Sequence, residues 1–179
     1  VTAKNSMKGR NNNGHITNIN RAGGHKKMYR HVDFYRKKFD MEATVERIEY
    51  DPNRSCYIML VKFEDASHAY YLAPQKIKAG DKIENGSKKE IKIGNSMPLQ
   101  DIPVGINIHN VEIQPGAGGK IARSAGSSVT ISGIDGNYSL IKLASGEVRK
   151  IDSRSLATIG VLSNPDQKNI KIGKAGRSR

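Results

Sequence analysis

Apolar and polar residues alternate in short runs along most of the chain, and this period of two predicts β-strands. The runs lie at 29–35, 42–50, 55–64, 68–73, 82–84, 106–113, 128–134, 137–143, 147–151 and 156–162. Turn signals separate them, such as Asp51-Pro52-Asn53, in which Pro presets φ, and Asp135-Gly136, a strong hairpin signal. Helical turns are expected only near 73–78 and 120–124. The pattern therefore predicts an all-β protein.

The strand runs form two groups, which suggest two small barrels because closure removes the exposed edges of short strands. The expected division is a basic arm at 1–29, a first barrel at 30–105, a second barrel at 106–163 and a basic tail at 164–179. Residues 1–28 hold almost no large apolar side chains. We therefore expect an irregular arm that becomes ordered only against its partner.

Charge is concentrated at the two ends of the chain, which has a formal net charge of +13. Residues 1–38 hold ten Lys/Arg and one acid, and residues 168–179 hold five Lys/Arg and no acid. Residues 39–167 hold fifteen bases and sixteen acids. Two basic ends around a nearly neutral body indicate a polyanionic partner, and solvated tails are the alternative. No apolar run has the length needed to span a bilayer, so we expect no membrane partner.

Little in the chain points to catalysis or metal binding. The single cysteine, Cys56, excludes an intrachain disulfide framework and lies in an apolar run, where we expect a buried or half-buried thiol. The five histidines have no partners at zinc spacing. The Gly116–Lys120 run lacks the first glycine and the hydroxyl residue of a P-loop, and no nucleophile–base set is evident. We expect no enzymatic activity, no metal and no cofactor, since structural Mg²⁺ would belong to RNA.

Cations, flat rings and glycines occur together in the arm, and this mixture suits RNA, whose loops expose bases. The candidate contacts there are Arg10, His15, Arg21, Gly24, His25, Lys26, Lys27, Tyr29 and Arg30. A second basic cluster follows, with Arg36, Lys37 and Lys38. The basic tail adds Lys174, Arg177 and Arg179.

A glycine-rich stretch from His109 to Gly126 joins the two groups of strands. Its candidate contacts are Gly118, Gly119, Lys120, Arg123 and Ser124. Glycine lets the backbone come close to a ligand, so we expect RNA phosphates to meet backbone N–H groups here, and a purely structural turn is the alternative. Arg54 is either a phosphate ligand or half of a rim salt bridge. His109 either makes a local hydrogen bond or touches RNA.

These motifs resemble one family, that of the universal large-subunit ribosomal protein L-two. The resemblance covers the chain from about residue 10 to its end. Its specific segments are Arg10-Asn-Asn-Asn-Gly14, Gly23-Gly-His-Lys26, Val32-Asp-Phe34, Glu46-Arg-Ile-Glu-Tyr-Asp-Pro-Asn-Arg-Ser55, Leu72-Ala-Pro74, Ile102-Pro-Val-Gly105, His109-Asn-Val-Glu112, Ala122-Arg-Ser-Ala-Gly126, Ser145-Gly-Glu-Val-Arg149 and Gly173-Lys-Ala-Gly176.

The resemblance implies an OB-fold domain followed by an SH3-like barrel. It also implies a structural, non-catalytic role: binding large-subunit rRNA, helping to assemble the peptidyl-transferase region and helping the subunits to associate. Family contacts map to Arg10, the Gly24–Lys27 run, Arg54 and the Gly118–Ser124 loop. A free-standing OB/SH3-type translation or assembly factor is the alternative function.

The chain departs from the family pattern at its C-terminal end, where a longer basic extension with a His-Pro-His-Gly-Gly-Gly motif normally follows. We expect that extension to be trimmed, disordered or carried by a separate chain, or else the particle to manage without it. Other ribosomal proteins are expected as partners. The composition is rich in Lys, Ile and Asn, which suggests an AT-rich genome. Together these features favour a mitochondrial ribosome, with a bacterial or plastid ribosome as the alternative.

Overall fold

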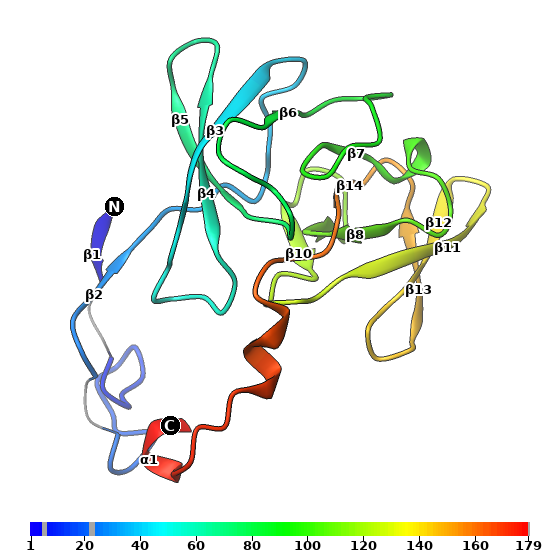
Figure 1. The fold of residues 1–179 in the computed structure, drawn as a ribbon. Coiled ribbons are helices and arrows are strands. Elements are labelled where there is room, and N and C mark those ends of the chain that lie inside the picture. The colour runs from blue at the N-terminus through cyan, green and yellow to red at the C-terminus, as the bar shows by residue number, and fades with distance from the viewer. Residues whose placement is uncertain (5–6, 22–23, 179) are drawn as a thin grey trace. The chain divides into compact units, whose positions relative to one another are not determined.

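A computed structural model describes residues 1–4, 7–21 and 24–178. Contacts between Cα atoms divide the chain into two compact units, one of residues 1–31 and one that begins at Val32. Strands make up nearly all of the regular structure, so the all-β expectation is confirmed (Figure 1). The predicted contact Arg179 lies outside the described residues.

In the first unit, β1 (Thr2–Lys4) pairs antiparallel with β2 (Lys27–Tyr29). The side-chain oxygen Oδ1 of Asn11 accepts hydrogen bonds from the backbone of Asn13 and His15, at 3.0 Å each, which closes a tight turn. We expected an irregular arm, and the structure instead pairs its two ends. Almost all of this unit's residues are exposed, so backbone hydrogen bonds rather than a core hold the pairing.

The second unit begins with a four-stranded antiparallel sheet in the order β5-β4-β3-β6 (Figure 1). Its strands are β3 (Glu42–Glu49), β4 (Ile58–Phe63), β5 (His68–Leu72) and β6 (Lys82–Glu84), close to the predicted runs. Alternate side chains of β3 and β4, including Val45, Val61 and Phe63, enter one core with Tyr71. The register shifts between Val45 and Arg47, which bends β3 and increases its twist.

A six-stranded sheet follows, in the order β13-β12-β11-β8-β14-β7. Its members are β7 (Ser96–Pro98), β8 (Asn107–His109), β11 (Val129–Asp135), β12 (Tyr138–Lys142), β13 (Val148–Asp152) and β14 (Leu156–Ile159). A separate hairpin joins β9 (Val111–Glu112) to β10 (Gly119–Ile121). Ile108, Ile131 and Ile141 form the centre of this sheet's core. A smaller cluster contains Cys56, which is buried as expected.

Several local predictions were wrong. The run at 106–113 is two strands, because the backbone of Asn110 has a φ of 50° and breaks the pairing between them. The run at 29–35 contains only the end of β2. The chain turns after it, because the Asp33 carboxylate accepts hydrogen bonds from the backbone N–H groups of Tyr35 and Arg36. Residues 73–78 form no helix. At 120–124 there is no helical turn either, because Lys120 and Ile121 belong to β10, which pairs with β9.

The regular helices of the described chain are short: η1 (Leu99–Asp101), η2 (Pro165–Asn169) and α1 (Ala175–Ser178). None of the helices in the part of the chain that the structure describes has the length and apolar character to cross a membrane. The strand β7 pairs with β14, and Met97, Leu99 and Ile102 pack in the core of the second sheet. These residues precede the predicted domain boundary at 105/106, yet they pack with the second sheet rather than the first.

Candidate nucleic-acid interface

Two arginines from distant parts of the sequence meet at one aromatic ring. The guanidinium carbon of Arg54 lies 5.1 Å from the centroid of the Phe34 ring, and that of Arg123 lies 4.6 Å from it. Arg54 also forms an ion pair through Nε with the buried carboxylate of Asp51, at 3.0 Å. A ring that attracts both cations by its quadrupole offsets part of their mutual repulsion. The structure therefore holds two guanidinium groups close together: that of Arg123, which is exposed, and that of Arg54, which is half-buried and has its charge partly compensated by Asp51.

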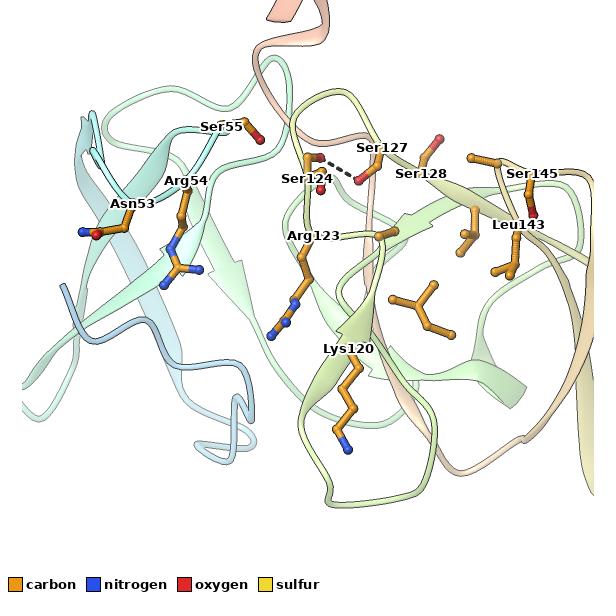
Figure 2. Close-up of a pocket in the computed structure, with 14 residues that line it drawn as sticks. Asn53, Arg54, Ser55, Lys120, Arg123, Ser124, Ser127, Ser128, Leu143 and Ser145 are labelled. Carbon is orange, nitrogen blue, oxygen red and sulfur yellow. Dashed lines mark hydrogen bonds between the residues drawn. The ribbon is translucent and has the colours of Figure 1, made fainter. Parts of the chain in front are cut away.

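Both arginines line a pocket of about 580 Å³, together with Lys120 and several serines. Figure 2 shows the side chains of Arg54, Arg123 and Lys120 extending to one side, while Ser124, Ser127 and Ser128 lie on the other. Arg123 and Lys120 are exposed. An open pocket with three cations and several hydroxyl groups suits phosphate and sugar oxygens.

Hydrogen bonds join the segments around the pocket to one another. The hydroxyl of Ser55 accepts a bond from the backbone N–H of Ala125, at 3.1 Å, and the backbone oxygen of Ser55 accepts one from the Asn164 side chain, at 2.8 Å. The Ser127 hydroxyl donates to the backbone oxygen of Ser124, at 2.6 Å. These bonds fix the segment that carries Arg123 against the turn that carries Arg54, so both cations are preorganised.

The backbone N–H groups of Gly116, Gly118 and Gly119 are already hydrogen-bonded within the protein, which corrects the expectation that these glycines offer them to a phosphate. The buried carboxylate of Glu112 accepts hydrogen bonds from the N–H of Gly116 at 3.1 Å, of Gly118 at 2.9 Å and of Leu156 at 3.2 Å. The N–H of Gly119 donates to the backbone oxygen of Phe34, at 3.0 Å. An internal carboxylate thus occupies the position that we expected a phosphate to take. The cations remain as the groups that a ligand can reach.

Packing explains why the loop contains glycine. A Cβ atom on Gly119 would lie 2.2 Å from Oδ1 of Asn110, which is closer than van der Waals contact permits. At Gly118 the φ is +76°, and a Cβ atom would lie 3.2 Å from the Tyr35 ring. Both glycines are buried, and we infer a role in shaping the loop rather than direct phosphate contact.

His109 is buried and makes a local hydrogen bond, one of the two alternatives that the sequence left open. Its Nδ1 lies 2.8 Å from the backbone oxygen of Gly160, to which a neutral imidazole donates. Burial lowers the pKa of His109 to about 4, an effect that the bond to Gly160 opposes. The ring is neutral at physiological pH and is inaccessible to RNA.

Arg36 was predicted to contact RNA, and the structure instead places it in the interior. Its Nη1 donates to the Thr158 hydroxyl at 3.0 Å and its Nη2 donates to the backbone oxygen of Gly94 at 2.9 Å. The guanidinium also lies 4.3 Å from the centroid of the Tyr71 ring. Desolvation by burial lowers the pKa of Arg36, but arginine stays charged at physiological pH. The residue joins the two sheets and is out of reach of a polyanion.

The neighbouring lysines differ from each other. Lys38 pairs with Asp65 at 2.6 Å and also donates to the Ser67 hydroxyl. Lys37 is exposed, and its Nζ lies 5.1 Å from the centroid of the Tyr35 ring. Of this predicted cluster, Lys37 is therefore the side chain that is open to a partner.

The predicted contacts of the arm are mostly exposed. This holds for Arg10, His15, Arg21, Gly24, His25, Lys26 and Lys27, while Tyr29 and Arg30 are half-buried. Tyr29 packs edge-on against the His31 ring, with 5.2 Å between the ring centroids. In the tail, Lys174 and Arg177 are exposed. No group of three or more His, Cys, Asp or Glu side chains in 1–4, 7–21 and 24–178 is arranged to hold a metal ion.

Comparison with known proteins identifies relatives along the whole sequence. Residues 1–85 match the family model "Ribosomal Proteins L2, RNA binding N-terminal domain", and residues 92–179 match "Ribosomal Proteins L2, C-terminal domain". The chain is 83% identical over 180 aligned positions to the large ribosomal subunit protein uL2 of Pelagibacter ubique, covering 100% of this chain and 64% of that protein.

Two further relatives, also named large ribosomal subunit protein uL2, are bacterial as well. The protein of Granulibacter bethesdensis is 57% identical over 98% of this chain, and that of Rickettsia bellii is 58% identical over 96%. The chain spans 64% and 63% of their lengths, respectively. The two domain matches agree with an OB-fold domain followed by an SH3-like barrel.

Proposed function

We propose that this chain, which belongs to the ribosomal protein L2 family, is a structural component of the large ribosomal subunit that binds its rRNA. The single observation that carries the proposal is the pair Arg54 and Arg123, held at one Phe34 ring above an open pocket. We further propose that this contact helps to assemble the peptidyl-transferase region and to join the subunits. No feature of the site requires the chain to act as an enzyme.

The exposed cations of the arm and the tail supply the second part of the interface. We propose that Arg10, His15, Arg21, Gly24–Lys27, Tyr29 and Arg30 follow the RNA backbone and its bases, and that Lys174, Arg177 and Arg179 contact phosphates. Exposure of the described members supports this assignment. The division of the chain into arm, two barrels and tail also stays a prediction. Packing of Met97 and Leu99 with the second sheet supports a boundary nearer the gap between the two family models, at 85–92.

The compartment and the remaining partners are finer predictions. The relatives described above are bacterial and so favour a bacterial ribosome, while the mitochondrial ribosome stays a prediction from composition. Other ribosomal proteins are expected neighbours. A separate chain that supplies the C-terminal extension also stays a prediction. The intact mass of the protein isolated from its particle tests it, because a mass well above 19.7 kDa would show that the same polypeptide continues.

A double substitution, Lys120→Ala with Arg123→Ala, tests the rRNA contact. Each lost phosphate contact should reduce the salt dependence of binding by about one in the log–log slope, so the double variant should lose about two. Binding is measured by filter assay with a transcript of Pelagibacter ubique large-subunit rRNA. Lys62→Ala with Lys92→Ala is the matched control, because both lysines are exposed and neither lines the pocket.

An unchanged slope in the Lys120/Arg123 variant, with folding intact by circular dichroism, would contradict the assignment of this pocket. The alternative function, a free-standing translation or assembly factor, is separated by sedimentation. A ribosomal component stays with large subunits in high salt, whereas a factor dissociates from them.

A further inference from the structure

A second pocket, of about 660 Å³, lies on residues that the proposed rRNA contact does not use. Its walls include the rings of Tyr35 and Phe39 and the apolar side chains of Pro98 and Leu156. Tyr35 is 48% exposed and Phe39 is 49% exposed. The chain has only three phenylalanines, so a half-exposed one at the edge of a cavity is notable. Exposed aromatic surface around a hollow is typical of a binding site.

The charges around this pocket leave one cation without a carboxylate partner. Of the two acids that line it, Asp40 pairs with Lys89 at 3.0 Å, and Glu112 accepts the three backbone bonds described above. Arg154 pairs with Asp152 at 2.8 Å. Within the described residues, Lys37 has no carboxylate at ion-pair distance, and its Nζ lies over the Tyr35 ring. The pocket thus combines flat apolar walls with one available positive charge.

We propose that this pocket holds one unstacked RNA base, with the rings of Tyr35 and Phe39 against the base and Lys37 at its phosphate. Aromatic side chains bind splayed bases by stacking, and a nearby cation contacts the backbone. The proposal rests on the proposed rRNA binding and extends it to a second contact. An apolar side chain of a neighbouring protein would also fit the walls, but it gives no use to the cation.

The second pocket lies near the first one along the same segments of the chain. Tyr35 directly follows Phe34, whose ring is shared by Arg54 and Arg123. The Tyr35 ring also packs against Gly118 in the loop that ends in Lys120. The loop contributes Gly116 to this pocket and Lys120 to the first one, so one RNA region can engage both.

Replacement of Phe39 separates stacking from simple apolar packing. Phe39→Leu keeps an apolar side chain but removes the flat ring, so binding to the Pelagibacter ubique transcript should weaken about 5- to 150-fold, as for one lost stacked base. Phe39→Tyr should bind like the wild type. Tyr138→Leu is the matched control, because Tyr138 is 46% exposed with Lys150 at 4.9 Å from its ring, yet it lines neither pocket. Its binding should not change.

Lys37→Ala should reduce the salt slope by about one, whereas Phe39→Leu should leave the slope unchanged. A photo-crosslinking residue at position 39, in chains assembled into large subunits, should crosslink to rRNA. A crosslink to a protein instead, or equal binding by Phe39→Leu and the wild type, would overturn the proposal. Failure of the wild-type chain itself to bind the transcript would refute the proposed function, so the two failures are distinguishable.

Discussion

The buried imidazole of His109 predicts that the folded chain loses stability on mild acidification. The ring is 1% exposed, donates to the backbone oxygen of Gly160, and has a pKa lowered to about 4. In the unfolded chain a histidine titrates near 6.5. Between these two values the unfolded state binds more protons than the folded state, so acid favours unfolding.

The size of the effect follows from the two pKa values. The contribution of His109 is complete above about pH 6.5 and is lost as the pH falls through the folded-state value of about 4. Each pKa unit corresponds to about 1.4 kcal/mol, so the full loss is about 3.5 kcal/mol. Between pH 7.5 and pH 4.5 the expected loss is about 2.5 kcal/mol, a large part of the stability of a small protein.

Urea unfolding at a series of pH values, followed by circular dichroism, measures this loss. His109→Gln is the comparison, because glutamine keeps an N–H donor but does not titrate in this range. Only the difference between the two pH profiles is assigned to His109. Asp65 and Asp152, whose pKa values are lowered to about 2, contribute equally to both profiles. Parallel profiles for the wild type and the variant between pH 7.5 and 4.5 would refute the reasoning.

Two substitutions test the buried polar groups that organise the site. Arg36→Ala should lower the free energy of unfolding by about 3 kcal/mol, because the Thr158 hydroxyl and the Gly94 oxygen lose a charged donor. Arg36→Lys should not restore the stability, since a single ammonium group cannot replace the two donor nitrogens of the guanidinium. Glu112→Gln should cost about 2 kcal/mol, because an amide accepts through one oxygen only, while exposed Glu64→Gln should change little. Urea unfolding at neutral pH measures both, and wild-type stability in Arg36→Ala or Glu112→Gln would contradict the role assigned to that side chain.

The sequence predicted the strands best where one face of a strand is buried. In β3 and β4, apolar side chains alternate because every second one enters the core, so the pattern in the sequence is the pattern in the fold. The turn at Asp51-Pro52-Asn53 was also predicted, and the Asp51 carboxylate accepts the N–H of Asn53 at 2.9 Å. Short strands such as β7 were missed, because three residues carry too little periodicity and pair with β14, some sixty positions later.

The site was predicted in part, since composition reports which groups are present but not which of them are already satisfied. Lys120 and Arg123 are exposed as expected, whereas the loop amides bind Glu112 and the Phe34 backbone. The sequence prediction considered the glycine-rich loop alone. The carboxylate that binds the loop amides belongs to Glu112, which lies in the preceding strand β9 and is buried. Arg36 shows the same limit, because its hydrogen-bond partners are distant in sequence.

The hydrogen bonds between Glu112 and the loop have a physical consequence for the interface. A carboxylate that takes up the loop amides excludes a phosphate from them, because the second anion would have neither donors nor compensation for repulsion at close range. The same bonds make the loop rigid, since each of the two glycine amides and the Leu156 amide is held by Glu112. Lys120 and Arg123 therefore project from a fixed frame, and binding RNA need not order the backbone beneath them. Such preorganisation lowers the entropic cost of association. Glu112 therefore supports RNA binding by Lys120 and Arg123 through the loop that it holds, without contacting the RNA itself.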